Sequence, residues 1–458
     1  VLPFVDMSQG KDQEYFSDGL SEQLLNGLAQ VPELRVAGRT SSFHFKGRNE
    51  DLRAIGRQLN VATVLEGSVA RSGDTLRITA QLINTDSGFH LWSQTYDRQF
   101  TGVFALQDEI VASVVAALKV KLLPGQAPVA TRSKRPEAYD QYLLGRDYWR
   151  QQNMAGWHQA VTAYRRATEL DPGFAAAWAG LAAAASEVAY EHADPADVDA
   201  AQKQARVYAQ QAIDADPGEA EGYAIRGRLR SEFDFDQAGA LADLQRALAI
   251  NPGNSDTHQM AGTVFSALGR FEEAESELGK ALALDPLNAR ALDSIAELFK
   301  DRGDLRQAEV FYRRALELVP KAGYSLSGLA QTQVLQGKHA DALATVARID
   351  GDRPRQLYNL VLVRHALGDR ARSDAALEEL RDRFGAGWAY QIGVAHGWRG
   401  ERDLAFQWFE RAYRQHDGGL ILTRTEPLLA GVRDDPRFPV LLRKLGLEST
   451  NGQAAVAR

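Results

Sequence analysis

The fold of this chain is decided by one short motif that recurs along its second half. The clearest copy reads Leu268-Gly269-Arg270-Phe271-Glu272-Glu273-Ala274, followed by Ala281 and by Asp285-Pro286. The glycine suits the left-handed residue that ends a helix, and the two alanines suit a close crossing of two helices. The proline cannot continue the preceding helix. The motif therefore predicts two packed helices joined by a tight turn.

Prolines recur at the end of each copy with an almost constant spacing. They are Pro172, Pro217, Pro252, Pro286, Pro320 and Pro354, separated by 45, 35, 34, 34 and 34 residues. Alanines recur twelve and five residues before four of them, at Ala160 and Ala167, Ala205 and Ala212, Ala274 and Ala281, and Ala308 and Ala315. A period of 34 residues is typical of stacked helix pairs. The sequence predicts an all-α superhelical solenoid of about eight helix pairs over residues 137–418.

Departures from the period mark the irregular parts of the array. The 45-residue step predicts a lengthened turn around residues 190–199, and the unit at 355–384 fits the pattern poorly. Residues 419–447 leave the pattern and are expected to cap the apolar end of the solenoid. Pro124, Gly125 and Pro128 are expected to end the preceding helix, and residues 125–136, which include a short basic stretch, are expected to form a linker. A polar tail, 448–458, is expected to be disordered.

The first 124 residues follow a different pattern. Strands are predicted at residues 1–5, 34–45, 62–70, 76–84 and 89–96, and helices at 16–31, 51–59 and 103–122. Turn residues between the last three strands favour hairpins. This part is expected to form a small α/β domain with a mixed sheet.

Both parts resemble known families. The repeats resemble the tetratricopeptide repeat (TPR), on the motif around Gly269 and on Ala308, Tyr312 and Ala315 before Pro320. Residues 1–124 resemble the TolB amino-terminal-like domain, on Tyr15-Phe16-Ser17-Asp18-Gly19-Leu20-Ser21-Glu22, on Val64-Leu65-Glu66-Gly67-Ser68-Val69 and on His90-Leu91-Trp92. Together, the two resemblances span almost the whole chain.

The resemblance implies a bacterial, membrane-anchored polypeptide of which this chain is the carboxy-terminal half. The amino-terminal half of such proteins is commonly a winged-helix DNA-binding domain, a nucleotide cyclase or a protein kinase, and none of these is expected within the chain. The sequence opens on Val1 within an expected strand, so we expect that its start is missing. The expected location is the periplasmic side of the inner membrane, with the cytoplasm as the alternative.

Composition excludes several functions. The chain has no cysteine, which excludes disulfides and thiolate metal sites. Its net charge of −7 is mixed and without a long basic tract, which argues against nucleic acid as a partner of this portion. No apolar run reaches the roughly 18 residues of a membrane span. No phosphate-binding glycine loop occurs and the nine histidines lack metal-ligand spacing, so no cofactor or metal is expected.

One arrangement could suggest catalysis. Ser41 and Ser42 stand near His44, as a nucleophile and a base might be placed in a hydrolase. Neighbours on a strand point to opposite faces, and no elbow of glycines surrounds these residues. We therefore expect no enzyme activity from this chain.

The candidate binding residues come from the TPR resemblance. Positions of each first helix line the concave groove in TPR arrays, and they correspond here to Gln259 and Thr263, Asp293 and Glu297, and Ser327 and Gln331. The lysines and asparagines that grip a peptide carboxylate are absent from these positions. An amide-rich, acidic groove favours a neutral or basic extended peptide or helix.

The leading hypothesis is a non-catalytic scaffold that binds a protein or peptide, as the sensory or regulatory region of a signalling or transcription-regulatory protein. One alternative is the regulatory and dimerising region of a nucleotide cyclase or kinase whose catalytic domain is absent here, with a homodimer as a candidate assembly. Another is a scaffold for cell-envelope assembly, which rests on fold analogy alone.

Overall fold

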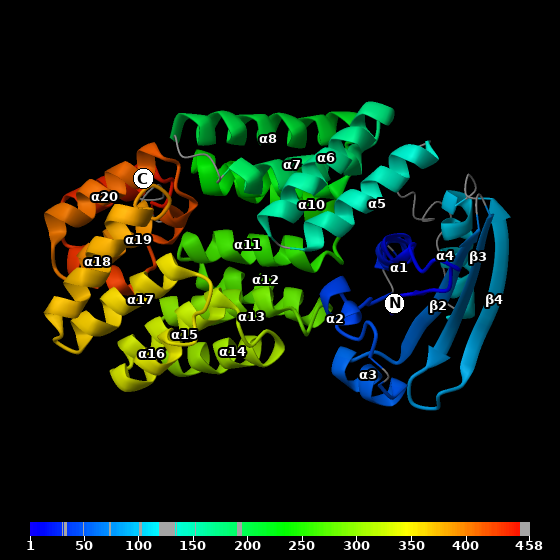
Figure 1. Ribbon diagram of the computed structural model, residues 1–458, viewed down its shortest axis with the longest axis horizontal. Helices are drawn as coiled ribbons and strands as arrows, with labels where there is room; N and C mark the ends of the chain where they lie inside the picture. The colour runs from blue at the N-terminus through cyan, green and yellow to red at the C-terminus, as the bar shows by residue number, and fades with distance from the viewer. Residues whose placement is uncertain are drawn as a thin grey trace, which may run out of the picture.

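The computed structural model describes residues 1–29, 31, 34–48, 50–72, 75–99, 103–118, 133, 135–151, 153–189 and 195–448. A small mixed sheet with flanking helices forms the N-terminal part, and a curved stack of helices follows it (Figure 1). Residues 190–194 of the turn expected at 190–199, most of the linker and the tail from residue 449 lie outside the described residues. Residues 195–199 are not part of a turn, because they begin helix α8 (Pro195–Ala215).

The N-terminal domain contains four strands in the order β1-β2-β3-β4. They are β1 (Val5–Asp6), β2 (Thr63–Ser72), β3 (Thr75–Asn84) and β4 (His90–Gln99). The short β1 runs parallel to β2, and the other pairs are antiparallel. Alternate residues of β3, such as Ile78 and Leu82, are buried against α1 (Glu14–Ala29) and α4 (Val103–Ala117) because a strand has a side-chain period of two. Helix α3 (Leu52–Leu59) packs Ile55 and Leu59 near the start of β2.

The strand predicted at residues 34–45 is wrong, because residues Arg39–Phe43 form helix α2. The Arg39 guanidinium lies 3.9 Å from the centre of the Phe43 ring, a contact one helical turn apart that an extended chain cannot make. The N-terminal end of α2 also binds the array, as described below. A tertiary contact has therefore overridden the alternating pattern of the sequence.

The array consists of successive helix pairs. Their bounds are α5 (Pro136–Arg150) with α6 (Met154–Leu170), α7 (Ala175–Val188) with α8 (Pro195–Ala215), α9 (Ala220–Leu229) with α10 (Gln237–Ile250), α11 (Ser255–Ala267) with α12 (Phe271–Leu284), α13 (Ala289–Asp301) with α14 (Leu305–Leu318), α15 (Gly323–Leu335) with α16 (His339–Val346), α17 (Arg353–Ala366) with α18 (Arg370–Phe384), and α19 (Ala389–Trp398) with α20 (Arg402–Arg414). A π-helical turn, η3 (Arg230–Asp234), follows α9.

The residues of the repeat motif have the roles that the sequence predicts. All eight alanines at the two recurring positions are fully buried. The turn glycines have positive φ angles, for example +71° at Gly269 and +85° at Gly303, where a side chain would be strained. Gly262 of α11 lies against Leu278 of α12, and a Cβ there would come within 2.6 Å of Leu278 Cγ. Small residues thus set the close approach of paired helices.

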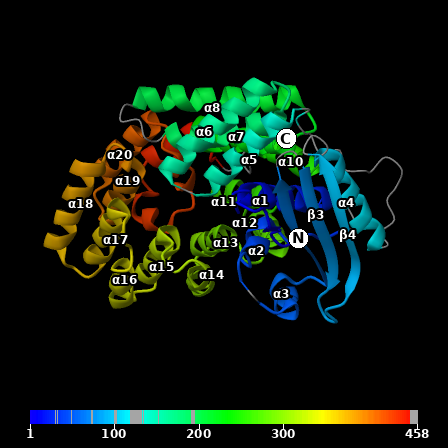
Figure 2. The ribbon, with the colours of Figure 1, turned by 45° about the vertical axis from the view of Figure 1, so that its right-hand side comes forward.

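After α20 the chain forms short helical turns. These are η4 (Gly418–Leu422), η5 (Pro427–Val432) and α21 (Arg437–Lys444). They fold back inside the curve of the array, where Figures 1 and 2 show them near α19 and α11. Leu428, Leu429, Leu445 and Leu447 are buried in one cluster with Ala267 of α11 and Tyr390 of α19.

Candidate functional site

The six residues predicted for the groove lie on α11, α13 and α15, and we call them the row; their side chains bond in three separate groups. Gln259 donates to Ser294 Oγ at 2.7 Å and to Thr263 Oγ1 at 3.2 Å. Ser325 donates to Asp293 at 2.9 Å. Gln331 donates to Ser327 at 3.0 Å, and Asn359 of α17 reaches the same hydroxyl at 2.8 Å. Many of the polar groups of these residues are therefore bonded within the chain.

The acidic part of this row is compensated by a buried lysine. Lys300 is 1% exposed, and its ammonium lies 2.6 Å from Glu297 and 3.5 Å from Glu426 of the C-terminal segment. It also donates to Gln331 Oε1 at 3.2 Å. Glu297 further accepts from the Tyr312 hydroxyl. Two of the predicted groove residues, Glu297 and Gln331, thus hold a lysine that binds the chain's own C-terminal segment.

The C-terminal segment, residues 418–447, spans the inside of the array. Leu445 and Leu447 pack with Phe235, which follows η3, while Leu429 packs against Gly397 of α19. Just before the segment, His416 Nδ1 lies 2.7 Å from the Phe233 carbonyl. One short segment can touch η3, α11, α13 and α19 only from the inner side of the curve. The ends of these first helices are therefore covered by the segment.

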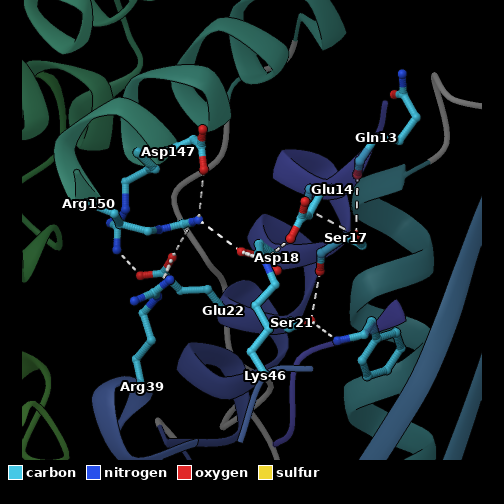
Figure 3. Close-up of polar contacts among 12 residues, drawn as sticks. Gln13, Glu14, Ser17, Asp18, Ser21, Glu22, Arg39, Lys46, Asp147 and Arg150 are labelled. Carbon is cyan, nitrogen blue, oxygen red and sulfur yellow. Dashed lines mark hydrogen bonds and ion pairs between the residues drawn. The ribbon is translucent and has the colours of Figure 1, made fainter. Parts of the chain in front are cut away.

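The N-terminal domain binds the last turns of α5 through a buried cluster of charges. Figure 3 shows Asp18 and Glu22 of α1 surrounded by Arg39, Lys46 and Arg150. Lys46 lies 2.8 Å from Asp18, and Arg150 lies 3.3 Å from Asp18 and 3.2 Å from Glu22. Arg39 lies 3.2 Å from Glu22, which also pairs with Arg146 of α5. Four cations thus surround two carboxylates that are only 4% exposed.

The same interface is apolar and continuous with the core of the array. Phe16, Leu20 and Leu24 of α1 belong to one buried cluster with Tyr142 and Leu143 of α5. A Cβ at Gly19 would come within 2.5 Å of Leu143, so helix α1 can approach α5 only with glycine there. The N-terminal domain and the first repeat therefore share a core.

Helix α2 makes the second contact between domain and array. The Ser41 amide donates to Asp285 at 2.6 Å, the Leu287 amide donates to Ser41 Oγ at 2.8 Å, and the Gly38 amide donates to the Leu284 carbonyl at 2.5 Å. Burial raises the pKa of Asp285, and its hydrogen bonds with Ser41 oppose that rise. The domain thus bridges α5 and the turn between α12 and α13.

The geometry gives no support to a Ser–His pair in this region. Ser41 is fully buried and its hydroxyl serves the domain contact, while Ser42 donates to the Ala37 carbonyl at 3.4 Å. His44 Nε2 lies 3.0 Å from Arg48. Burial lowers the pKa of His44, with a further contribution from Arg48.

Sequence reasoning missed the basic residues at the start of the groove. Arg146 follows Gly145, which lies against Tyr164 of α6 as Gly262 lies against Leu278 in a later repeat. By this register, Arg146 corresponds to Thr263. Aligning the repeats on the glycine instead of the proline would have found it, because the second helix of the first repeat, α6, has 17 residues where α12 has 14.

Sequence reasoning also missed the exposed residues of the groove. Asp256, Arg290 and Tyr324 start α11, α13 and α15 at intervals of 34 residues, and each lies three residues before a predicted groove residue. All three are exposed, Tyr324 to 74%. Residues three apart share a helix face. We call these three residues the rim.

Burial affects the acids of the row. It raises the pKa of Asp293 to about 6, with a contribution from Glu297, and the hydrogen bond from Ser325 opposes the rise. One Asp293 oxygen is buried without a hydrogen-bond partner. Burial also raises the pKa of Asp301 well above its usual range, again with Glu297 nearby. Below about pH 6, Asp293 is therefore mostly protonated and the row carries less negative charge.

The described residues offer neither a metal cluster nor a membrane-spanning helix. Within them, no group of three His, Asp or Glu side chains could hold a metal ion. Of the helices in that part, none has the length and apolar character needed to cross a bilayer.

Comparison with known proteins identifies the repeats. Two sequence models of the tetratricopeptide repeat match residues 229–298 and 289–321. A Rhizobium meliloti (strain 1021) protein named "Putative adenylate cyclase 3" is 40% identical over 227 residues, which cover 49% of this chain and 38% of that protein. The matched part is thus well under half of that relative.

Solved structures give more distant likenesses. A TPR protein from Parabacteroides merdae is 16% identical with a TM-score of 0.42, and the match covers 59% of this chain and 100% of that one. A thermophilic TPR protein from Thermus thermophilus is 22% identical with a TM-score of 0.35, over 45% and 99% of the two chains. The matched repeat models and the stacked helix pairs together show that this chain carries a TPR array.

Proposed function

We propose that this chain is a non-catalytic binding and regulatory region of a bacterial signalling or transcription-regulatory protein. In this proposal the array binds a protein or peptide along the middle of its concave face. The observation that carries the proposal is the exposed rim of Asp256, Arg290 and Tyr324, one helical turn before the predicted groove residues.

The rim and the row suit a partner of mixed or neutral composition. Lys300 compensates Glu297, which weakens the attraction of the row for a basic peptide. Arg290 and Asp256 offer one charge of each sign, and Tyr324 offers an exposed ring on which the Arg355 guanidinium stacks at 3.9 Å. Aromatic and arginine side chains often dominate binding energy at interfaces.

The rim also supplies clean test variants. Reversal of Glu297 would disturb the buried Lys300, whereas Arg290→Glu and Tyr324→Ala change exposed side chains. The partner is first captured from bacterial lysate and purified. We expect each variant to weaken the affinity for this partner by about tenfold or more. Arg165→Glu, an exposed arginine on α6, is the matched control. Binding by both rim variants at wild-type affinity would refute the groove assignment.

A second candidate is the regulatory region of a nucleotide cyclase, and the name of the Rhizobium meliloti relative favours it. In that case the polypeptide that contains this chain would include a cyclase domain. The test is to compare cyclase activity of the complete polypeptide with and without Arg290→Glu and Tyr324→Ala. Absence of a cyclase domain from the gene would remove this candidate and leave the first in place.

The location follows the same proposal. We propose the periplasmic side of the inner membrane, and the TolB-like resemblance of residues 1–124 supports it. A reporter fused after Glu448 that is active only in the cytoplasm would contradict this location.

A further inference from the structure

We propose that strand β4 is a dimerisation edge at which a second copy of this chain adds its own β4 in antiparallel orientation. The sheet order places β4 at the edge, so in the part of the chain that the structure describes it has a strand on one side only. An edge strand presents a row of unpaired N–H and C=O groups that can pair with another strand. This interface is separate from the groove of the proposed function.

The geometry of β4 suits pairing with a further strand. It is ten residues long, and from Trp92 to Gln99 its register with β3 has no bulge. Natural edge strands are commonly protected by proline, bulges or inward-pointing charges. β4 contains no proline and no lysine. Its outer side in Figures 1 and 2 points away from the array.

The two charges of β4 are already paired within the domain. Arg77 of β3 binds Asp97 through two hydrogen bonds of 2.7 Å and 3.2 Å. Arg98 binds Glu109 of α4 at 3.1 Å. Because both charges have partners, neither would repel an incoming strand as an unpaired charge would.

The sequence of β4 is complementary to itself in one register. The outward-facing groups of an edge strand belong to alternate residues, so a two-fold pairing places one residue opposite its own copy. With Thr95 at that centre, Asp97 lies opposite Ser93, and Arg98 lies opposite Trp92, a pair that suits a cation–π contact. No like charges face each other. Centred on Gln94 instead, the pairing would set Arg98 against His90, which is less favourable.

The occupant is a second copy because this self-complementary register needs no other sequence. Nine opposed residues from one pair of strands form a small interface, below the size of stable complexes. We therefore expect dimers whose fraction rises with concentration.

The chain has no cysteine, so a single introduced thiol reports the contact without interference. Directly opposed residues of an antiparallel pair have Cα atoms about 4.5–5.5 Å apart, within the range for a disulfide. We expect oxidised Thr95→Cys to form a covalent dimer. Thr79→Cys is the matched control, since Thr79 lies beside Thr95 on β3, and its two copies would be about 14 Å apart.

A second variant tests the same contact without a covalent bond. Thr95→Lys places two ammonium groups opposite each other and should abolish the dimer seen by light scattering, while Thr79→Lys should not. A chain that stays monomeric at every concentration, or a dimer that Thr95→Lys leaves intact, would overturn the proposal. A monomeric chain whose β4 pairs with a strand of a different protein would also overturn it.

Discussion

Charged side chains are buried at both ends of the concave face, and each contacts groups of opposite sign. At one end, Glu22 lies among three arginines, and at the other, Lys300 lies between Glu297 and Glu426. Such groups stabilise a fold little as complete sets, but removal of one member leaves an uncompensated charge. These residues therefore hold the ends of the groove in a fixed arrangement.

Replacement of Glu22 should be costly. Glu22→Ala leaves Arg39, Arg146 and Arg150 with reduced compensation, and we expect a loss of roughly 3–5 kcal/mol in the free energy of unfolding, measured with urea. Glu169→Ala removes an exposed pair with Arg166 and should cost less than about 1 kcal/mol. Equal losses of unfolding free energy in the two variants would mean that the buried cluster stabilises the fold no more than an exposed ion pair.

Asp293 should make stability depend on pH. Its pKa is raised from 3.8 to about 6 by burial, so the folded chain keeps a proton that the unfolded chain loses. The stability that this bound proton gives the folded chain is fully present below pH 3.8 and is lost as pH rises to about 6. At pH 7, Asp293→Asn should therefore be more stable than wild type by on the order of 2 kcal/mol.

The measurement is urea unfolding at several pH values, compared between wild type and variant. Asp350→Asn, at a side chain that is 81% exposed, is the control. The difference in unfolding free energy between it and wild type should be the same at every pH. Parallel curves for wild type and Asp293→Asn would show that Asp293 is charged in the folded chain.

At the scale of elements, the C-terminal segment acts as part of the core. Leu429 of η5 is fully buried against Gly397 of α19, and Leu428 and Val432 are buried with it. Burial of each such side chain contributes about 1.5–3 kcal/mol. A partner peptide therefore cannot easily displace the segment, and the groove ends where the segment begins.

Truncation of Leu429 tests this role. We expect Leu429→Ala to lower the free energy of unfolding by roughly 2–5 kcal/mol, because it removes contacts and leaves a cavity. Leu404→Ala on α20, where the side chain is 42% exposed, should cost less than about 1 kcal/mol. A mild effect at Leu429 would indicate a loosely attached segment.

The elements also show where sequence reasoning succeeds and where it stops. Helix pairs could be predicted because alanine and glycine recur at positions where backbones approach closely. Helix α2 could not, because Ser41 and Gly38 bond to residues of α12 and α13 that lie more than 240 positions away. Similarly, groove positions could be assigned from the repeat register, but Lys300 and Glu426 meet only through the return of the chain.

At the scale of the whole molecule, the N-terminal domain, the array and the C-terminal segment pack against one another. The N-terminal domain packs along α5, with which it shares a core, and contacts the turn before α13. The C-terminal segment covers the ends of α11 and α13. The rim at Asp256, Arg290 and Tyr324 stays exposed, and it is the surface that we propose for a partner. The expected orientation of β4 away from the array leaves the dimer edge accessible at the same time.

Hydrogen–deuterium exchange tests most directly whether the domain, the array and the segment form one body. We predict slow exchange with similar protection in α1, α5, α13 and residues 428–445, because they would open together. In Glu22→Ala, protection of α1 and α5 should fall together. Fast exchange of α1 or of residues 428–445 while α11–α14 stay protected would contradict the account, because the groove would then be open at that end.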